Sequence, residues 1–278
     1  MALRSIPGMD KVIIGFITAW CGSHATFALN DYMDMEMDRK RFQHLKKFNG
    51  FDIDSVIVRH PLAQGYLSKK SVMIWIVTLG IITLIGAYWL SPVACILFIL
   101  SVSLEIWYCK MALVSAWKFL PSGIMVALGA LAGWFAVTNE LDWPSILAFL
   151  FWMYAWEVGG RNIVNDWADV EEDKYLGIKT VPVVYGLKVA GAIIILFAFL
   201  TVIISLVIGL LLDLNLLFFL GAVSVGCYTM LFPGLKLIKE KNSEAAHTLF
   251  NRASFYPVSM LVVLVLSLYI PKFLGGIL

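Results

Sequence analysis

The sequence predicts an all-α fold, a polytopic transmembrane helical bundle of about eight spans. Hydrophobic residues make up 60% of the 278-residue chain and charged residues only 14%, whereas charged residues are about 25% of a typical soluble domain. The mean hydropathy is +0.85. Apolar runs of about 20 residues, the length of helix that crosses a bilayer, recur along the whole chain. We therefore expect a single transmembrane domain over residues 1–278.

Each expected span is an apolar run bounded by polar or turn-forming residues. The eight runs lie at 11–30, 71–90, 92–109, 118–138, 143–165, 188–210, 212–233 and 252–276. The linkers between them alternate in character. Polar, basic linkers lie at 31–70, 110–118, 166–188 and 234–251, and short linkers without Lys or Arg lie at 91–92, 138–143 and 212–215.

The basic residues indicate an orientation in the membrane. Of the 21 Lys and Arg residues, only Arg4, Lys11 and Lys272 fall on the side of the short linkers. Cytoplasmic loops carry the excess of Lys and Arg in membrane proteins. We therefore expect an integral protein of the cytoplasmic membrane, surrounded by lipid, whose long basic linkers face the cytoplasm. The formal net charge of +2 is too small to indicate nucleic-acid binding.

Two aspartate-rich motifs follow the same pattern and form a pseudo-repeat at 30–38 and 165–173. The chain reads "ALNDYMDMEMDRK" at 28–40 and "IVNDWADVEEDKY" at 163–175. On an α-helix, residues spaced i, i+3 and i+7 lie on one face. The spacing thus stacks three carboxylates on one face at each motif, preceded by an amide, and the residues are Asn30, Asp31, Asp34 and Asp38, then Asn165, Asp166, Asp169 and Asp173.

Such a stack of carboxylates is unfavourable unless a cation binds it. Like charges repel, the carboxyl end of a helix disfavours anions by about 0.3–1 kcal/mol each, and charges near a bilayer cost more. Ligand sets made only of oxygen suit Mg²⁺ or Mn²⁺ and not zinc. Six carboxylates are enough for two ions bridged by a diphosphate. Basic side chains that could hold its oxygens are Arg39, Lys40, Arg41, Arg59, Lys110, Lys118, Lys174 and Lys179.

A Mg²⁺–diphosphate site at the end of an apolar bundle favours a lipid diphosphate as substrate, with its tail in the membrane. Arg161 pairs with Glu157 at i, i+4 or reaches this diphosphate. A divalent-cation transporter is the alternative of another class. Transporter sites tend to lie near the midplane on broken helices, whereas these motifs end helices at one face, so we favour the enzyme.

The motifs and their surroundings resemble the UbiA superfamily of intramembrane prenyltransferases. "NDYMDMEMD" at 30–38 resembles its first Asp-rich signature, and "RNIVNDWADVEEDKYLGIKTVPVVYG" at 161–186 resembles its second. "HPLAQGYLS" at 60–68 resembles the stretch after the first motif, and "LFNRASFYP" at 249–257 resembles the start of the last helix. The resemblance implies a bundle around a central cavity in which Mg²⁺ ionises a polyprenyl diphosphate and the prenyl group passes to a lipophilic acceptor.

The resemblance also implies roles for individual residues. The predicted catalytic residues are Asp34, Asp38, Asp169 and Asp173. The predicted metal ligands are Asn30, Asp31, Asp34, Asp38, Asp166, Asp169 and Asp173. The predicted diphosphate-binding residues are Asn30, Tyr108, Lys110, Lys118, Arg161, Asn165, Lys179 and Arg59. An aromatic quinone precursor is the expected acceptor, and a geranylgeranylglyceryl phosphate, as in archaeal ether-lipid synthesis, is the alternative.

The chain departs from the family pattern in three places. Family members usually have nine helices with the first motif ending the second, whereas here the motif ends the first expected span. His60 takes the place of the family's Arg before Pro, and Arg59 lies one residue earlier. The family's Tyr-x-x-x-Lys is not present as written. Tyr108 is followed by Lys110, and Lys118 is the favoured counterpart of the family's Lys.

Overall fold

The structure, a computed structural model, describes residues 7–44 and 60–275, and only the backbone of residues 42–44 and 271–275. All regular secondary structure in this described part of the chain is helical, which confirms the predicted all-α class. The chain divides into two compact units. The first unit comprises Met1–Leu141 and Glu171–Lys179, and the second comprises Asp142–Val170 and Thr180–Leu278. The single domain expected over 1–278 stays a prediction.

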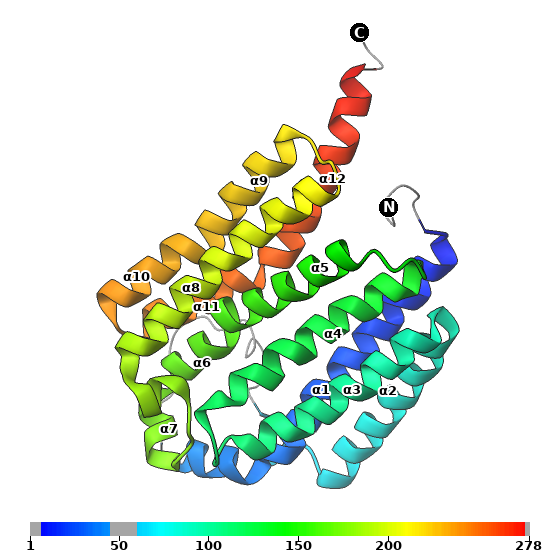
Figure 1. Cartoon of the computed structure of the whole chain (residues 1–278). Helices are drawn as coiled ribbons and strands as arrows, with labels where there is room; N and C mark the ends of the chain where they lie inside the picture. Colours follow the sequence, from blue (N-terminus) through cyan, green and yellow to red (C-terminus); the bar gives the residue numbers. More distant parts are fainter. Residues whose placement is uncertain (1–6, 45–59, 276–278) are drawn as a thin grey trace. The chain divides into compact units, whose positions relative to one another are not determined.

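The first unit is built on four long helices, coloured blue to green in Figure 1. They are α1 (Met9–His44), α2 (Lys69–Leu90), α3 (Pro92–Met111) and α4 (Phe119–Val137), the last preceded by the short 3₁₀ helix η3 (Ala116–Lys118). The helix α1 packs chiefly on α2, and α3 packs on α4 and α2. Most of α7 (Val170–Leu176) also belongs to this unit.

Local polar residues set the ends of these helices. The hydroxyl of Ser68 accepts a hydrogen bond from Ser71 N at 3.1 Å and caps the start of α2, as serine does at many helix N-termini. At the far end, Ser91 N donates to Ala87 O at 2.8 Å. Pro92 then opens α3, where its missing N–H costs nothing. The predicted short linker at 91–92 is thus a tight corner between two spans.

The second unit contains the remaining helices, coloured green to red in Figure 1. They are α5 (Trp143–Trp156), α6 (Ile163–Ala168), α8 (Val181–Leu211), α9 (Leu216–Gly226), α10 (Phe232–Glu240), α11 (Ser243–Ser254) and α12 (Tyr256–Gly275). Two π-helical turns, η4 (Glu157–Asn162) and η5 (Cys227–Leu231), join α5 to α6 and α9 to α10. The helix α8 packs on α5, α6 and α9, and α12 packs on α9.

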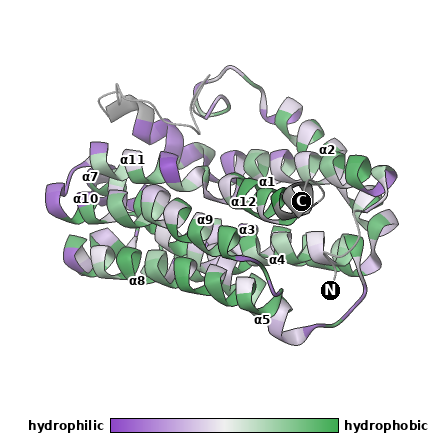
Figure 2. Ribbon diagram, turned by 90° about the horizontal axis from the view of Figure 1, so that it is seen from above, coloured by the Kyte–Doolittle hydropathy of each residue, from purple (hydrophilic) through white to green (hydrophobic). Residues whose placement is uncertain are grey.

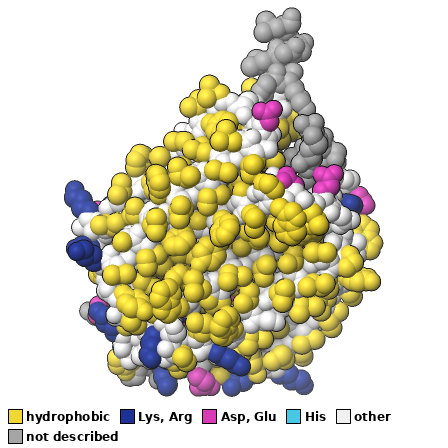
Figure 3. Space-filling view, in the orientation of Figure 1, with side chains coloured by type: hydrophobic (Ala, Val, Ile, Leu, Met, Phe, Trp, Pro, Cys, Tyr) yellow, Lys and Arg dark blue, Asp and Glu magenta, His cyan; other side chains and the backbone are white. Residues whose placement is uncertain are grey.

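In the described residues, seven helices are long and apolar enough to span a membrane. This is roughly the predicted count of eight. The span expected at 143–165 is helical, but the π turn η4 divides it into two α-helices of 14 and 6 residues. Hydrophobic residues dominate α8 and α9 in Figure 2, whereas hydrophilic residues gather at α7 and at one end of α10. Hydrophobic side chains also cover most of the face in Figure 3. The chain is an integral membrane protein.

The structure corrects two sequence expectations. The first span was expected to stop near residue 30, but α1, which is 36 residues long, continues through the whole first motif to His44. The second motif was expected on one unbroken helical face, which is wrong. The helix α6 ends at Ala168, and Asp169, with φ −98° and ψ 13°, separates it from α7. These dihedral angles lie in the bridge region, so Asp166 and Asp173 do not share one continuous helix.

We expect Gly159→Ala to destabilise the second unit. A Cβ at Gly159 would lie 2.6 Å from Ala198 N and 2.8 Å from Phe197 C, both backbone atoms of α8. Backbone atoms cannot move aside as a flexible side chain can, and overpacking of this kind costs about 1–3 kcal/mol. Thermal unfolding of the detergent-purified protein measures the effect.

Gly133→Ala is the matched control, because nothing lies within 4 Å of a Cβ there. It should leave the midpoint unchanged or raise it, since alanine has the higher helix propensity. Equal midpoints for the two variants would contradict the close approach of η4 to α8.

Candidate functional site

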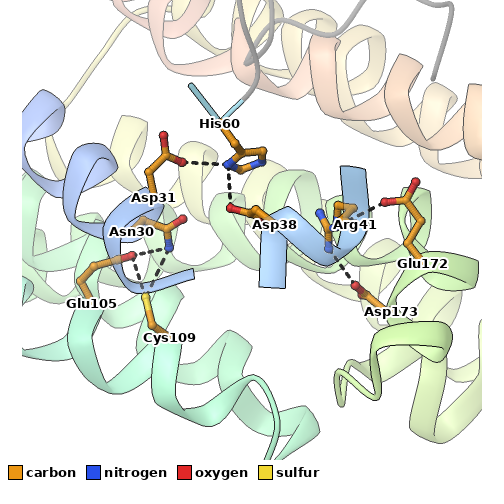
Figure 4. A network of polar contacts seen from close by, with 9 residues as sticks. All are labelled: Asn30, Asp31, Asp38, Arg41, His60, Glu105, Cys109, Glu172 and Asp173. Carbon is orange, nitrogen blue, oxygen red and sulfur yellow. Dashed lines mark hydrogen bonds and ion pairs between the residues drawn. The ribbon is translucent and has the colours of Figure 1, made fainter. Parts of the chain in front are cut away.

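The four residues of the first motif lie along the unbroken helix α1. Asn30, Asp31, Asp34 and Asp38 thus keep the i, i+4, i+8 and i, i+3, i+7 spacing that the sequence predicts. Asp38 is buried, while the other three are partly exposed. Figure 4 shows that side chains from α3 and from the segment before α2 contact this stretch of α1, and that side chains from α7 contact Arg41 farther along the same helix. The site in the first unit is therefore assembled from four separate parts of the chain.

Asn30 is held by an acidic side chain of α3. Its Nδ2 donates to Glu105 Oε1 at 2.8 Å and contacts Cys109 Sγ at 3.4 Å (Figure 4). Glu105 is itself buried in an otherwise apolar helix, where a carboxylate is stable only with partners. Because the amide nitrogen is engaged by Glu105, the carbonyl oxygen of Asn30 is left as the group that can bind a cation.

His60 bridges two carboxylates of the motif. Its Nδ1 lies 2.8 Å from Asp31 Oδ1 and 3.1 Å from Asp38 Oδ2 (Figure 4). The turn that carries His60 is anchored by Leu62, which is 2% exposed and packs with Met35 and Val72 between α1 and α2. The position of the imidazole against the motif is therefore fixed by a hydrophobic contact two residues away.

Asp34 and Lys118 form the opposite-charge part of the site. Asp34 interacts electrostatically with Lys118 and His60, and also with the carboxylates of Asp38 and Glu105. Lys118, at the end of η3, is buried, and its Nζ donates to Tyr108 OH at 3.2 Å. The ammonium group also lies 5.0 Å from the centre of the Tyr108 ring. The structure thus brings together the Tyr and Lys that the sequence analysis paired.

Arg41 joins the first motif to the last aspartate of the second. Its Nη2 donates to Asp173 Oδ1 at 3.2 Å, and its Nε lies 3.4 Å from Glu172 Oε2 (Figure 4). The side chain of Arg41 is 14% exposed and that of Asp173 only 4%. The same segment is tied again at its end, where Lys179 N donates to Ala112 O at 2.7 Å. Asp173 therefore lies in the first unit with Asp31, Asp34 and Asp38.

The rest of the second motif belongs to the second unit. Asp166 and Asp169 are buried there, and Asn165 is partly exposed. The neighbouring carbonyl of Ala168 accepts from Ser243 Oγ at 3.1 Å, which ties the end of α6 to α11. The π turn η4 directly precedes these residues, and π turns are frequent at functional sites.

Arg161 is held by side chains of the second unit. Its Nε lies 3.8 Å from Glu157 Oε2, which confirms the predicted pair. The guanidinium also donates to Ser254 Oγ at 2.5 Å and lies 4.5 Å from the centre of the Phe250 ring. Its role in binding diphosphate stays a prediction.

For three further residues that were predicted to bind diphosphate, the structure describes no contact with the aspartates of either motif. Lys110 is exposed at the end of α3. Lys179 is also exposed, and its Nζ donates to Val114 O at 3.3 Å. Arg59 lies outside the described residues. The diphosphate-binding role predicted for these three residues stays a prediction.

Sequence reasoning gave no contacts for three side chains of this network, His60, Glu105 and Glu172, although it did include Arg41 among the basic residues offered for diphosphate. The only signals in the sequence were an acidic residue inside an apolar span, for Glu105, and a departure from the family pattern, for His60. Neither signal names a partner, because the partners lie 29 and 75 positions away in the chain.

The donor set of the first unit fits a hard divalent cation. The amide oxygen of Asn30 and the carboxylates of Asp31, Asp34, Asp38 and Asp173 are the oxygen ligands that Mg²⁺ prefers. The buried ammonium of Lys118 and the guanidinium of Arg41 add positive charge beside them. Such a site suits a metal-bound phosphate ester, because the carboxylates can bind the metal ion and the basic side chains can bind the phosphate oxygens.

Comparisons with known proteins agree with this chemistry. The UbiA prenyltransferase family matches residues 1–265. The chain is 30% identical to digeranylgeranylglyceryl phosphate synthase of Pyrococcus horikoshii over 212 residues, which cover 74% of this chain and 68% of that protein. It is 25% identical to 4-hydroxybenzoate octaprenyltransferase of Francisella tularensis subsp. novicida over 226 residues, covering 80% and 73%.

A solved structure supports the fold. The UbiA homologue from Archaeoglobus fulgidus bound to DMAPP and Mg²⁺ superposes with a TM-score of 0.58 at 16% sequence identity. The match covers 92% of this chain and 88% of that one. At this level of identity, the likeness shows that the two chains share a helical fold.

We expect Arg41→Ala to loosen the segment 171–179. Removing the guanidinium takes a partner from a buried carboxylate, Asp173, which costs about 1–3 kcal/mol. Hydrogen–deuterium exchange of α7 peptides should therefore become faster, and the thermal midpoint should fall.

The matched control is Arg39→Ala. Arg39 is 46% exposed and pairs only loosely with Glu36 at 3.9 Å, and exposed pairs contribute at most about 1 kcal/mol. If α7 exchanged at the same rate in both variants, Arg41 would not be what holds the segment to α1.

Proposed function

The chain belongs to the UbiA prenyltransferase family, and on this premise we propose that it transfers a polyprenyl group from a polyprenyl diphosphate to a lipophilic acceptor in a Mg²⁺-dependent reaction. The observation that supports the proposal is that Arg41, just after the first motif on α1, pairs with Asp173, the last aspartate of the second motif. A divalent-cation transporter is not better supported, because it requires no basic residues such as Lys118 and Arg41 beside the carboxylates.

We propose different binding roles for the residues of the first unit. We assign Asn30, Asp31, Asp34, Asp38 and Asp173 to holding the metal–diphosphate. We assign Lys118, whose Nζ donates to Tyr108 OH, to binding a diphosphate oxygen, as lysine does in many phosphate sites. In the second unit, Asn165, Asp166, Asp169 and Arg161 remain the predicted partners of the same group.

The reaction breaks the bond between the first prenyl carbon and the diphosphate oxygen. A new bond forms from that carbon to the acceptor, which loses a proton. Mg²⁺, when bound, neutralises the charge that develops on the leaving diphosphate. The homologue from Archaeoglobus fulgidus was solved with DMAPP and with GPP, in each case with Mg²⁺, which supports this ligand class for the present chain.

The acceptor is proposed to be an aromatic quinone precursor. The relative from Francisella is named as an octaprenyltransferase of 4-hydroxybenzoate. The relative from Pyrococcus is named as a synthase of digeranylgeranylglyceryl phosphate, so geranylgeranylglyceryl phosphate is the second candidate. We further propose that the motifs face the cytoplasm, because the basic linkers lie on their side of the membrane.

We expect Asp34→Ala and Asp173→Ala each to abolish Mg²⁺-dependent turnover, with a loss of about a hundredfold or more, because each removes charge stabilisation that acts on the leaving group. The measurement is diphosphate release from geranylgeranyl diphosphate by purified protein. The acceptors are 4-hydroxybenzoate, a dihydroxynaphthoate and geranylgeranylglyceryl phosphate. The acceptor that yields prenylated product identifies the substrate class.

Glu36→Ala and Glu171→Ala are the matched controls. Both remove an exposed carboxylate from the same helices, α1 and α7, and both should keep wild-type turnover. If the wild type neither binds prenyl diphosphate nor turns it over, the proposal is overturned and the cation transporter is favoured.

We expect Glu105→Leu to weaken metal binding without removing any assigned ligand. Glu105 orients the amide of Asn30, and the loss of such outer partners typically costs 10–100-fold in metal affinity. The Mg²⁺ concentration for half-maximal turnover should therefore rise by about tenfold or more. Glu105→Gln keeps an oxygen acceptor for Asn30 Nδ2 and should shift this concentration much less. An unchanged Mg²⁺ dependence in Glu105→Leu would show that Glu105 does not orient Asn30.

A further inference from the structure

Among the described residues of the first unit, one cluster of possible metal ligands mixes nitrogen with oxygen. Asp31, Asp38 and His60 each offer one ligand atom, and these atoms lie within 4.8 Å of one another. His60 Nδ1 is the nearest common neighbour of the two carboxylates. The proposed Mg²⁺–diphosphate chemistry uses only oxygen ligands, so this imidazole is not part of it.

The two distances from His60 Nδ1 to the carboxylate oxygens match those between neighbouring ligands in a coordination shell. Two ligands at right angles around an ion with bonds of about 2.1 Å lie about 3.0 Å apart. His60 Nδ1 is 2.8 Å from Asp31 Oδ1 and 3.1 Å from Asp38 Oδ2. The same spacing also allows a hydrogen bond from Nδ1–H. Metal binding would displace that proton, because imidazole binds metal through a deprotonated nitrogen.

The imidazole is positioned before any ion arrives. Leu62 is buried against Met35 and Val72, and the chain closes a turn in which Gln64 N donates to His60 O at 3.2 Å and Tyr66 N donates to Pro61 O at 3.0 Å. Asp31 and Asp38 are separated by seven residues on one face of α1. His60, from the segment before α2, contacts both of them.

The kind of ligand decides which ion the cluster prefers. Carboxylate and amide oxygens suit both Mg²⁺ and Mn²⁺, whereas imidazole is a poor ligand for Mg²⁺ and a better one for first-row transition metals. We propose that Asp31, Asp38 and His60 form a metal site for a first-row transition-metal ion, with Mn²⁺ as the representative ion and His60 Nδ1 as a direct ligand. This inference rests on the proposed function, because Asp31 and Asp38 belong to both ligand sets, and a carboxylate can bridge two ions.

The test is Mn²⁺ binding by the metal-free, full-length protein without prenyl substrate. Pulsed electron paramagnetic resonance detects the coupling of Mn²⁺ to a directly bound imidazole nitrogen. We expect this coupling in the wild type and its loss in His60→Asn. Asparagine can replace the hydrogen bonds of Nδ1 but provides no imidazole. Mn²⁺ affinity should fall about tenfold or more, while Mg²⁺ affinity changes little, so selectivity for Mn²⁺ over Mg²⁺ should decrease.

His24→Asn is the matched control. His24 is an exposed histidine of the same helix α1, and its Nδ1 contacts Trp20 O at 2.8 Å. This variant should keep the imidazole coupling and the Mn²⁺ affinity. If His60→Asn does not fold, Asp31→Asn replaces it, and should lower Mn²⁺ affinity to a similar extent while the imidazole coupling persists.

The outcome is separable from that of the proposed function. Absence of imidazole coupling in the wild type, or a coupling that survives in folded His60→Asn, would overturn the inference and leave His60 as a hydrogen-bonding partner of the two carboxylates. Diphosphate release with Mg²⁺, measured on the same preparation, tests the proposed function independently. Turnover with Mg²⁺ but no imidazole coupling would overturn the metal site alone.

Discussion

The structure of the first unit depends on the repulsion among carboxylates at the end of an apolar helix. Asp31, Asp34 and Asp38 share one face of α1, and each additional negative charge there raises the cost of folding. The unit meets this cost with cationic and hydrogen-bonding side chains drawn from elsewhere in the chain. His60 contacts two of the carboxylates, Lys118 interacts with Asp34, and Arg41 contacts Asp173. The carboxylates held in this way are the residues that we propose bind a divalent cation.

The length of α1 lets these charges stay near water. A helix of 36 residues is about 54 Å long, whereas the hydrocarbon core of a bilayer is only about 30 Å thick. The carboxyl-terminal turns that carry the motif can therefore extend past the lipid while the amino-terminal turns remain in it. One continuous helix thereby connects the membrane-embedded part of the unit to its polar site. The depth of the span in the membrane therefore also sets the depth of the motif.

In the second unit, the notable feature is the close packing of helices at glycine residues. Gly159 lies against the backbone of α8, and Gly160 lies against Ala253 and Met230. A π turn at this point gives the chain an extra residue between α5 and α6, and it divides a run that the sequence presents as one uniform apolar span. The π turn precedes the second motif, and the break at Asp169 lies within it. Irregular backbone next to a motif is the usual place to find a functional site.

The sequence by itself determined the all-α class, the apolar spans, the two aspartate motifs and the oxygen-ligand chemistry they favour. These features are local, because hydropathy and helical spacing depend on residues close together in the chain. Only the tertiary structure decided which partners meet. Arg41 pairs with Asp173 across 132 positions, Asn30 with Glu105 across 75, and His60 with Asp31 across 29. The continuation of α1 to His44 and the break at Asp169 also came from the structure. Such pairs depend on how helices pack, and a single sequence contains no direct record of the distances between residues that lie far apart along it.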